Sequence, residues 1–195
     1  DETLRRTSVR KLKPLAFNLN LIQQLSELSW LPVDNNVSIA EMEQAFRSIV
    51  RTKGFSRWTD LLLVSVGNAA FCRLFNGDLW AMLTVFAATL LGFLVKQQLS
   101  RLKYNPLGVI ILSAFAASMA AACAVIFQLG STPQIALATS VLFLVPGVQM
   151  INSIMDLMHG HILMGISRGV HSIMMISCIT IGLSATMLIV GVNSL

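Results

Sequence analysis

The sequence contains few charged residues, and beyond residue 60 it contains almost none. Charged side chains make up 12% of the 195 residues, whereas soluble domains usually contain about 25%. Hydrophobic residues make up 55%, and the mean hydropathy is +0.72. This composition excludes an ordinary soluble domain and indicates an integral membrane protein.

Several chemical signatures are also missing. The three cysteines, Cys72, Cys123 and Cys178, lie apart in apolar segments, and no CxxC spacing indicates a disulfide or a zinc site. No Ser/His/Asp set, phosphate-binding loop or dinucleotide-binding glycine pattern occurs, so we expect neither enzyme activity nor a cofactor. The net charge of +5 is typical of the basic cytoplasmic segments of membrane proteins, so we expect no nucleic-acid partner.

Residues 1–56 hold most of the charge and are predicted to form a cytoplasmic N-terminal segment. Residues 1–13 are expected to be the last strand or hairpin arm of a domain whose earlier part is absent from this numbering. Apolar residues then recur at helical spacing in residues 15–30 and 38–54, which predicts two amphipathic helices. Ser38 and Glu41 form the S-x-x-E capping box at the start of the second helix.

Residues 57–195 are predicted to form an all-α transmembrane domain with five spans. A spanning helix needs about 20 largely apolar residues, and five segments meet or approach this length. The first three run over residues 58–75, 79–95 and 107–129, the fourth begins at Pro133, and the fifth covers residues 169–192. Asn105 and Thr132 are predicted to cap the third and fourth helices, because each precedes a proline suited to a first turn.

The distribution of positive charge predicts the orientation of these spans. All lysines and arginines except Arg73 lie before the first span, after the second or after the fourth, which are on one side of a five-span protein. The positive-inside rule therefore predicts a cytoplasmic N-terminus and a C-terminus outside. A five-span unit resembles one half of a transporter repeat, so we expect a partner or self-association in the lipid bilayer.

The third predicted span contains small residues at four-residue spacing, which allow membrane helices to approach closely. They form two ridges: Ser113, Ala117 and Ala121, and Ala114, Ser118 and Ala122. Gly165 and Gly169 form a GxxxG pattern at the start of the fifth span, which suits either helix packing or a tight entry turn.

The candidate functional residues are concentrated between Pro133 and Ser172. Gln149, Asn152 and Asp156 follow one another at i, i+3 and i+7, so a helix presents all three on one face. Pro146 and Gly147 interrupt the fourth span, and such breaks expose backbone groups that bind solutes in secondary transporters. Asp156 fits either this solute site or an interfacial acid paired with Arg168.

The remaining polar residues each leave two interpretations open. Arg168 can pair bidentately with a substrate carboxylate or anchor the fifth span at the membrane surface. Asn68, inside the first span, forms either a helix–helix hydrogen bond or part of the solute path. His159, His161 and His171 suit proton coupling better than a metal site, because histidine titrates near neutrality and their spacing matches no zinc set.

Three stretches of the sequence resemble the threonine/serine exporter family, particularly its two-component bacterial branch. They are FCRLFNGDLWAMLTVFAA from Phe71, ILSAFAASMAAA, and the run from Thr132 to Arg168. In that branch, a five-span subunit with a cytoplasmic N-terminal domain acts with a smaller, separate membrane subunit. The positions that match the family motif are Pro146, Gly147, Asn152, Asp156, Gly160, Gly165 and Arg168.

The resemblance implies export of small carboxylates across the bacterial inner membrane. The substrates are threonine and serine in the fused form, and C4 dicarboxylates such as succinate are suggested for the split form. The sequence departs from the family in lacking an upstream helix that contains histidine and glutamate, and in having Asn76-Gly77 where Gly-Gly is common. Two other hypotheses stay open: a passive channel lined by the small residues of the third span, and a membrane scaffold that recruits a partner.

Overall fold

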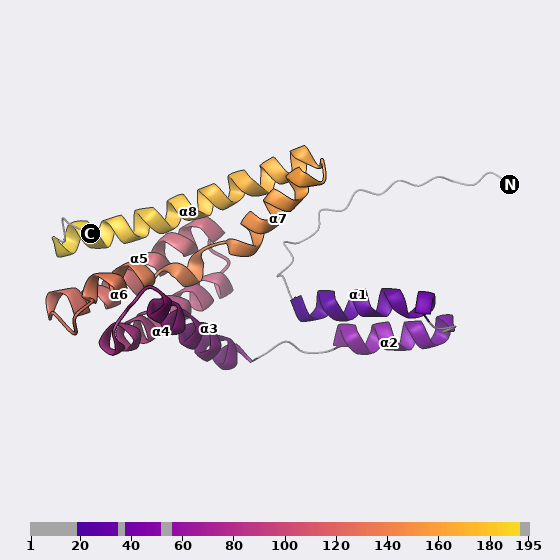
Figure 1. Cartoon of the computed structure of the whole chain (residues 1–195), viewed down its shortest axis with the longest axis horizontal. Helices are drawn as coiled ribbons and strands as arrows, with labels where there is room; N and C mark the ends of the chain where they lie inside the picture. The colour runs from indigo at the N-terminus through magenta and orange to yellow at the C-terminus, as the bar shows by residue number, and fades with distance from the viewer. Residues whose placement is uncertain (1–18, 35–37, 52–55, 192–195) are drawn as a thin grey trace. The chain divides into compact units, whose positions relative to one another are not determined.

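The computed structural model describes residues 19–34, 38–51 and 56–191, and within these ranges every regular element is helical. The chain divides into two compact units, Asp1–Phe55 and Ser56–Leu195, which we describe separately (Figure 1). The predicted hairpin arm at residues 1–13 and the predicted helix ends at residues 54 and 192 lie outside the described residues.

The first unit contains two amphipathic helices, α1 (Leu19–Asp34) and α2 (Ile39–Arg51), which contact each other. The predicted capping box is confirmed: the Ser38 amide donates to Oε2 of Glu41 at 2.9 Å, and the Glu41 amide donates to Oγ of Ser38 at 3.3 Å. The pKa of Glu41 lies below its ordinary value. The main cause is the hydrogen bond from the Ser38 backbone amide, and the bond from the Ser38 hydroxyl adds to it.

The second unit is a bundle in which α5 contacts α4, α6 and α8. Its elements are α3 (Arg57–Leu74), α4 (Leu79–Arg101), α5 (Pro106–Ile126), α6 (Pro133–Thr139), the short 3₁₀ helix η1 (Leu142–Leu144), α7 (Gly147–Met158) and α8 (Ile162–Val190). The predicted cap of α5 is confirmed, because the Leu107 amide donates to Oδ1 of Asn105 at 3.0 Å.

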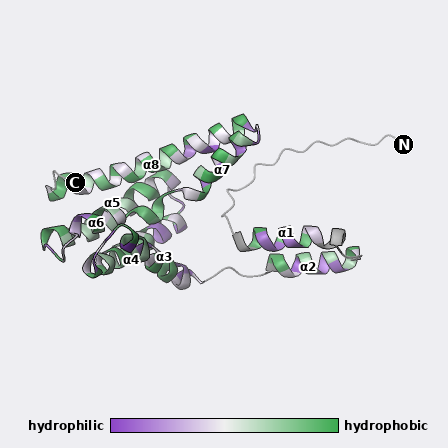
Figure 2. Cartoon of the chain, viewed as in Figure 1, coloured by the Kyte–Doolittle hydropathy of each residue, from purple (hydrophilic) through white to green (hydrophobic). Residues whose placement is uncertain are grey.

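Three helices in the described ranges are long and apolar enough to cross a membrane, namely α4, α5 and α8 (Figure 2). A fourth candidate is the pair Pro133–Leu144 and Gly147–Met158, whose two parts are bent by 60° at a short break. The first of the five predicted spans corresponds to α3, which forms but is not among these candidates. It has only 18 residues, and it carries Arg57, Asp60 and Arg73.

The small residues of α5 are packed between neighbouring helices, as their spacing predicted. Both ridges are buried, namely Ser113, Ala117 and Ala121, and Ala114, Ser118 and Ala122. On one side, the hydroxyls of Ser118 and Thr186 lie 2.6 Å apart and join α5 to α8. These residues are buried among the helices of this chain, so they do not form the pore lining that the channel hypothesis proposed for them.

Asp78 holds the turn between α3 and α4 to the turn before α6. Its carboxylate accepts hydrogen bonds from the Ser131 amide at 2.7 Å, the Ala81 amide at 2.8 Å and the Thr132 hydroxyl at 3.0 Å. The Ser131 bond is the main reason why the pKa of Asp78 lies below its ordinary value. The prediction that Thr132 caps α6 with its side chain is wrong, because its hydroxyl is bonded to Asp78 instead.

Gly130 allows these two turns to meet. Its φ of +79° is a left-handed conformation that side chains disfavour. A Cβ atom at this position would clash with the Asp78 carboxylate. The contact therefore depends on a glycine as well as on an acid.

Candidate functional site

The chain leaves the helical conformation between α6 and α7 for a local reason. Proline disfavours the helical conformation of the residue before it, and Val145 is accordingly extended, with φ −62° and ψ 127°. Pro146 then precedes the first residue of α7, and no side chain caps this helix. The first amides of α7 consequently have no side-chain acceptor.

A cleft of about 460 Å³ lies beside this break, between α3 and the segment that precedes α7. Its lining is mostly apolar and consists of Val64, Gly67, Asn68, Phe71, Phe75, Leu142, Phe143, Val145 and Gly147. Asn68 is the one residue of this lining with a polar side chain. The cleft thus combines apolar walls, one amide group and the beginning of α7.

Asn68 connects three helices. It is 4% exposed, and its Nδ2 donates to Oγ1 of Thr89 at 2.7 Å and to the carbonyl of Thr139 at 3.2 Å. Thr139 is the last residue of α6, so no later amide of that helix donates to its carbonyl. Asn68 therefore makes the helix–helix hydrogen bond that was one of its two interpretations, and it also lines the cleft.

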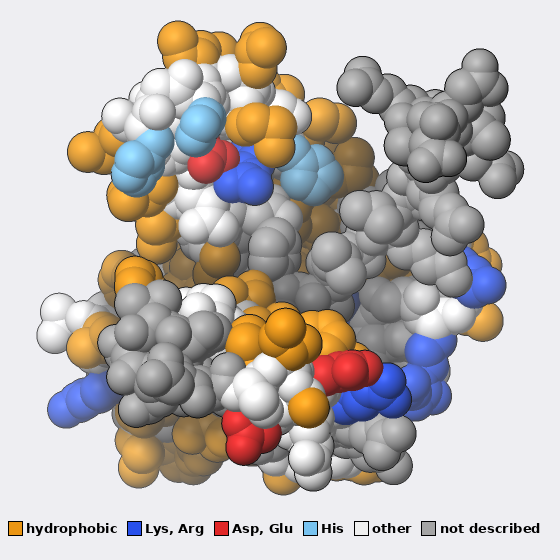
Figure 3. Space-filling model, turned by 90° about the vertical axis from the view of Figure 1, so that its right-hand side faces the viewer, with side chains coloured by type: hydrophobic (Ala, Val, Ile, Leu, Met, Phe, Trp, Pro, Cys, Tyr) orange, Lys and Arg blue, Asp and Glu red, His pale blue; other side chains and the backbone are white. Residues whose placement is uncertain are grey.

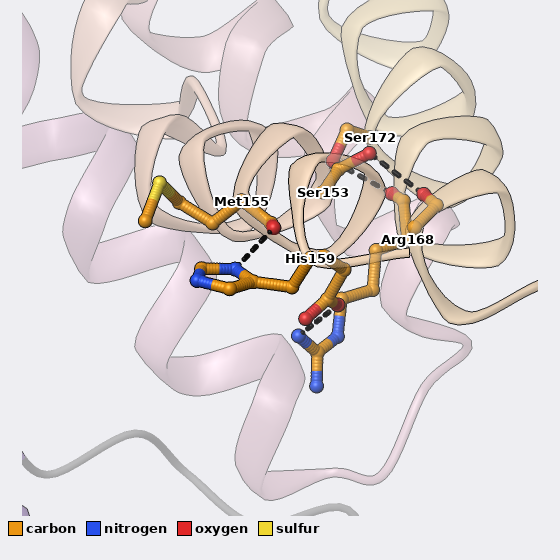
Figure 4. A network of polar contacts seen from close by, with 7 residues as sticks. Ser153, Met155, His159, Arg168 and Ser172 are labelled. Atoms are coloured by element: carbon orange, nitrogen blue, oxygen red, sulfur yellow. Dashed lines mark hydrogen bonds and ion pairs between the residues drawn. The ribbon is translucent and has the colours of Figure 1, made fainter. Parts of the chain in front are cut away.

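Asp156 on α7 and Arg168 on α8 form an ion pair across the hairpin of these two helices (Figure 4). Oδ2 of Asp156 lies 2.5 Å from Nη1 of Arg168, and their side chains are 23% and 43% exposed, respectively. Asp156 is thus paired with Arg168, as the interpretation as an interfacial acid proposed. Because the pair is only partly covered, an anion approaching from outside the hairpin can reach the guanidinium.

The hairpin that holds this pair is tightly packed. The hydroxyl of Ser153, which is buried on α7, donates to the carbonyl of Gly165 on α8 at 2.7 Å. A Cβ atom on Gly165 would lie 2.7 Å from Cγ of Leu157 and 3.0 Å from the Ser153 carbonyl oxygen, so a side chain here would displace Leu157. Ser153 is not among the predicted site residues, although it lies next to Asn152 on the predicted helix.

Gln149 and Asn152 lie on α7 between the cleft and the ion pair. Oε1 of Gln149 is buried without a hydrogen-bond partner among the described residues. The cleft reaches Gly147, and the rise of an α-helix places Asp156 about 14 Å further along the axis. The five predicted residues therefore do not form one cluster, since Asn68 lies at one end of α7 and the ion pair at the other.

The histidines are all exposed near the α7–α8 turn or on α8. Nδ1 of His159 lies 2.7 Å from the carbonyl of Met155 on its own helix, and the backbone amide of His161 donates to the Asp156 carbonyl at 2.8 Å. His171 lies one turn beyond Arg168. Figure 3 shows histidine side chains beside an acidic and a basic side chain at this end of the hairpin.

Comparison with known proteins gives consistent results. A family model described as "Putative threonine/serine exporter" matches residues 1–190. A protein of Escherichia coli K12 named "Probable succinate transporter subunit YjjP" is 33% identical over 167 residues, which cover 83% of this chain and 63% of that protein. A protein of the same name from Klebsiella aerogenes is 30% identical over 186 residues, which cover 93% of this chain and 71% of that protein. No solved structure matches the chain.

Proposed function

Because the chain belongs to the threonine/serine exporter family, we propose that it is a subunit of a transporter that exports a small carboxylate across the bacterial inner membrane. The relatives are named as subunits of a probable succinate transporter. This naming favours a C4 dicarboxylate over threonine or serine as substrate. It also favours a second membrane subunit as the partner.

The observation that carries the proposal is the break before α7 and the cleft beside it. The cleft volume of about 460 Å³ lies within the rough range of 300–1,000 Å³ that is typical of small-molecule sites. The N-terminus of α7 carries a partial positive charge that favours a carboxylate. The Gly147 amide donates to the Val145 carbonyl at 2.9 Å, and no side chain caps the amides that follow it. Transporters commonly bind anionic groups at interrupted helices of this kind.

The ion pair supplies a second position for a carboxylate. A substrate that reaches Arg168 competes with Asp156 for the same guanidinium, so binding and opening of the pair are coupled. Gln149 and Asn152 lie between this position and the cleft on α7. In this proposal the solute moves along the polar face of α7, and the nearby histidines exchange protons at its exposed end.

The charges at the two ends of α3 support the predicted five-span topology. Arg57 begins this helix and Arg73 lies in its last turn, so the guanidinium groups can extend to opposite membrane surfaces while the apolar middle spans. With α3 as a span, the N-terminus is cytoplasmic and the C-terminus is outside. Termini on opposite sides suit a half-transporter that needs a partner.

Efflux of labelled succinate tests this proposal. The chain and its partner subunit are produced together in cells that lack their own exporter. Asp156→Asn should reduce the initial efflux rate at least about tenfold while the amount of protein in the membrane is unchanged, because it removes the charge that balances Arg168. The matched control is Glu43→Gln, which breaks the exposed Glu43–Arg47 pair, 2.6 Å in length, on α2.

Three results would count against the proposal. Normal efflux from Asp156→Asn would show that the ion pair does not serve transport. Efflux that persists after collapse of the proton gradient would favour a passive channel. Unchanged succinate export after deletion of the chain would favour a membrane scaffold.

A further inference from the structure

A basic groove lies at the end of the bundle where α3 begins and α4 ends. It has a volume of about 420 Å³, and its described lining residues belong to α3 and α4. Its charged lining consists of Arg57, Asp60, Lys96 and Arg101, and Phe93 and Gln97 contribute further walls. None of these residues belongs to the cleft beside α7 or to the Asp156–Arg168 pair.

The positive charge of this groove exceeds its negative charge within the described residues, because three cations and one acid line it. Arg57, Lys96 and Arg101 make no ion pair there, since the ion pairs present are Glu43–Arg47 and Asp156–Arg168. Asp60 lines the same groove without bonding to any of the three. A half-buried cation with no anionic partner is unusual, because burial away from water penalises the charge.

Lys96 shows this most clearly. It is half-buried, and its Nζ lies 5.8 Å from the centroid of the Phe93 ring. The aromatic ring provides only a weak attraction compared with a carboxylate or a phosphate. Among the described residues, Lys96 thus contacts an aromatic ring at the groove but forms no ion pair.

The groove is also held in a defined position. Nε2 of Gln97 donates to the backbone carbonyl of Arg57 at 3.2 Å, which joins the end of α4 to the start of α3. Lys96 and Arg101 lie in the last turns of a candidate membrane span. Cations at the end of a span extend toward the lipid headgroups while their aliphatic stems follow the apolar surface.

We propose that this groove binds the phosphate of an anionic phospholipid headgroup, such as that of phosphatidylglycerol. Basic pockets between membrane helices bind such headgroups, and arginine pairs well with phosphate oxygens. The Phe93 wall and the position at the end of a span favour a ligand that carries acyl chains over a free anion. The proposal depends on the membrane location of the unit and not on which solute is exported.

Thermal unfolding of the purified full-length chain in mixed micelles tests the proposal. Phosphatidylglycerol should raise the unfolding temperature of the wild type more than phosphatidylcholine does. Lys96→Gln should bind the anionic lipid about fivefold more weakly, as expected for the loss of one charge near the headgroup. The matched control is Lys103→Gln, an exposed cation outside the groove, which should keep the wild-type shift.

The outcomes separate the possible ligands. Equal loss of the shift in Lys96→Gln and Lys103→Gln would overturn the proposal, because it would indicate general surface charge. A shift produced by inorganic phosphate or succinate alone, and abolished by Lys96→Gln, would overturn the assignment to lipid. If Lys96→Gln does not fold, Arg101→Gln at the exposed edge of the groove provides the same comparison.

Discussion

Replacing Asn68 with alanine should destabilise the helical bundle measurably, because this side chain joins three helices. Its two short hydrogen bonds, to Thr89 at 2.7 Å and to the Thr139 carbonyl at 3.2 Å, are lost together. Hydrogen bonds between membrane helices contribute about 0.6 kcal/mol on average and about 1.7 kcal/mol at most. The expected loss in the free energy of unfolding is therefore about 1–3 kcal/mol.

A double-mutant cycle isolates the bond between Asn68 and Thr89. Unfolding of Asn68→Ala, Thr89→Val and the double variant is followed by circular dichroism in mixed micelles. We expect a coupling energy of about 0.6–1.7 kcal/mol. The matched control pairs Asn68→Ala with Ser65→Ala, because the buried Ser65 hydroxyl donates to the Leu61 carbonyl of its own helix, at 2.8 Å, and to no other described residue.

The result that would refute this reasoning is additivity. If Asn68→Ala and Thr89→Val add within about 0.3–0.5 kcal/mol, as independent sites do, the hydrogen bond does not contribute to stability. The same variants also separate the two interpretations of Asn68. Thr89→Val leaves the amide in the cleft, so a loss of efflux per folded molecule in Asn68→Ala alone would assign the amide to the solute path.

Two further predictions concern the contacts between distant turns and helices. Gly165→Ala should cost about 1–3 kcal/mol of unfolding free energy, because the added Cβ would lie 2.7 Å from a leucine side chain of α7. Gly147→Ala should unfold like the wild type in the same micelle assay, because the added Cβ would meet no neighbouring atom within 4 Å. The lowered pKa of Asp78 means that its stabilising effect is complete above its ordinary value of 3.8 and is lost as the pH falls through the lower folded-state value. Asp78→Asn should remove this part of the acid dependence of the unfolding temperature, because asparagine has no carboxylate to take up a proton. An unaltered acid dependence in that variant would contradict the assignment.

Several features could be predicted because they depend on neighbours in the sequence. The composition indicates a membrane protein, since too few charges are present to cover a soluble surface. The capping box at Ser38 and the cap at Asn105 involve residues only two or three positions apart. The buried ridges of α5 follow from the four-residue spacing of small side chains. In each case the period or the local turn limits the possible contacts.

The candidate site was predicted only in part. The polar positions of α7 and the pairing of Asp156 with Arg168 follow from helical spacing and a short connecting turn, because the partners are 12 residues apart. The distance between this ion pair and Asn68 could not be predicted from the sequence, because it depends on the angle between α6 and α7. The number of candidate spans also differed from five, since an interrupted segment and a charged one were each counted as full spans.

The sequence by itself determined the membrane class, the helices and the caps at Ser38 and Asn105, because these depend on periodicity and on hydrogen bonds within a few residues. Only the tertiary structure decided that Asp78 holds Ser131, 53 positions away, and that Asn68 holds the end of α6, 71 positions away. Many polar side chains could have served as partners at such distances. The choice among them is made by the packing of whole helices, which no local pattern encodes.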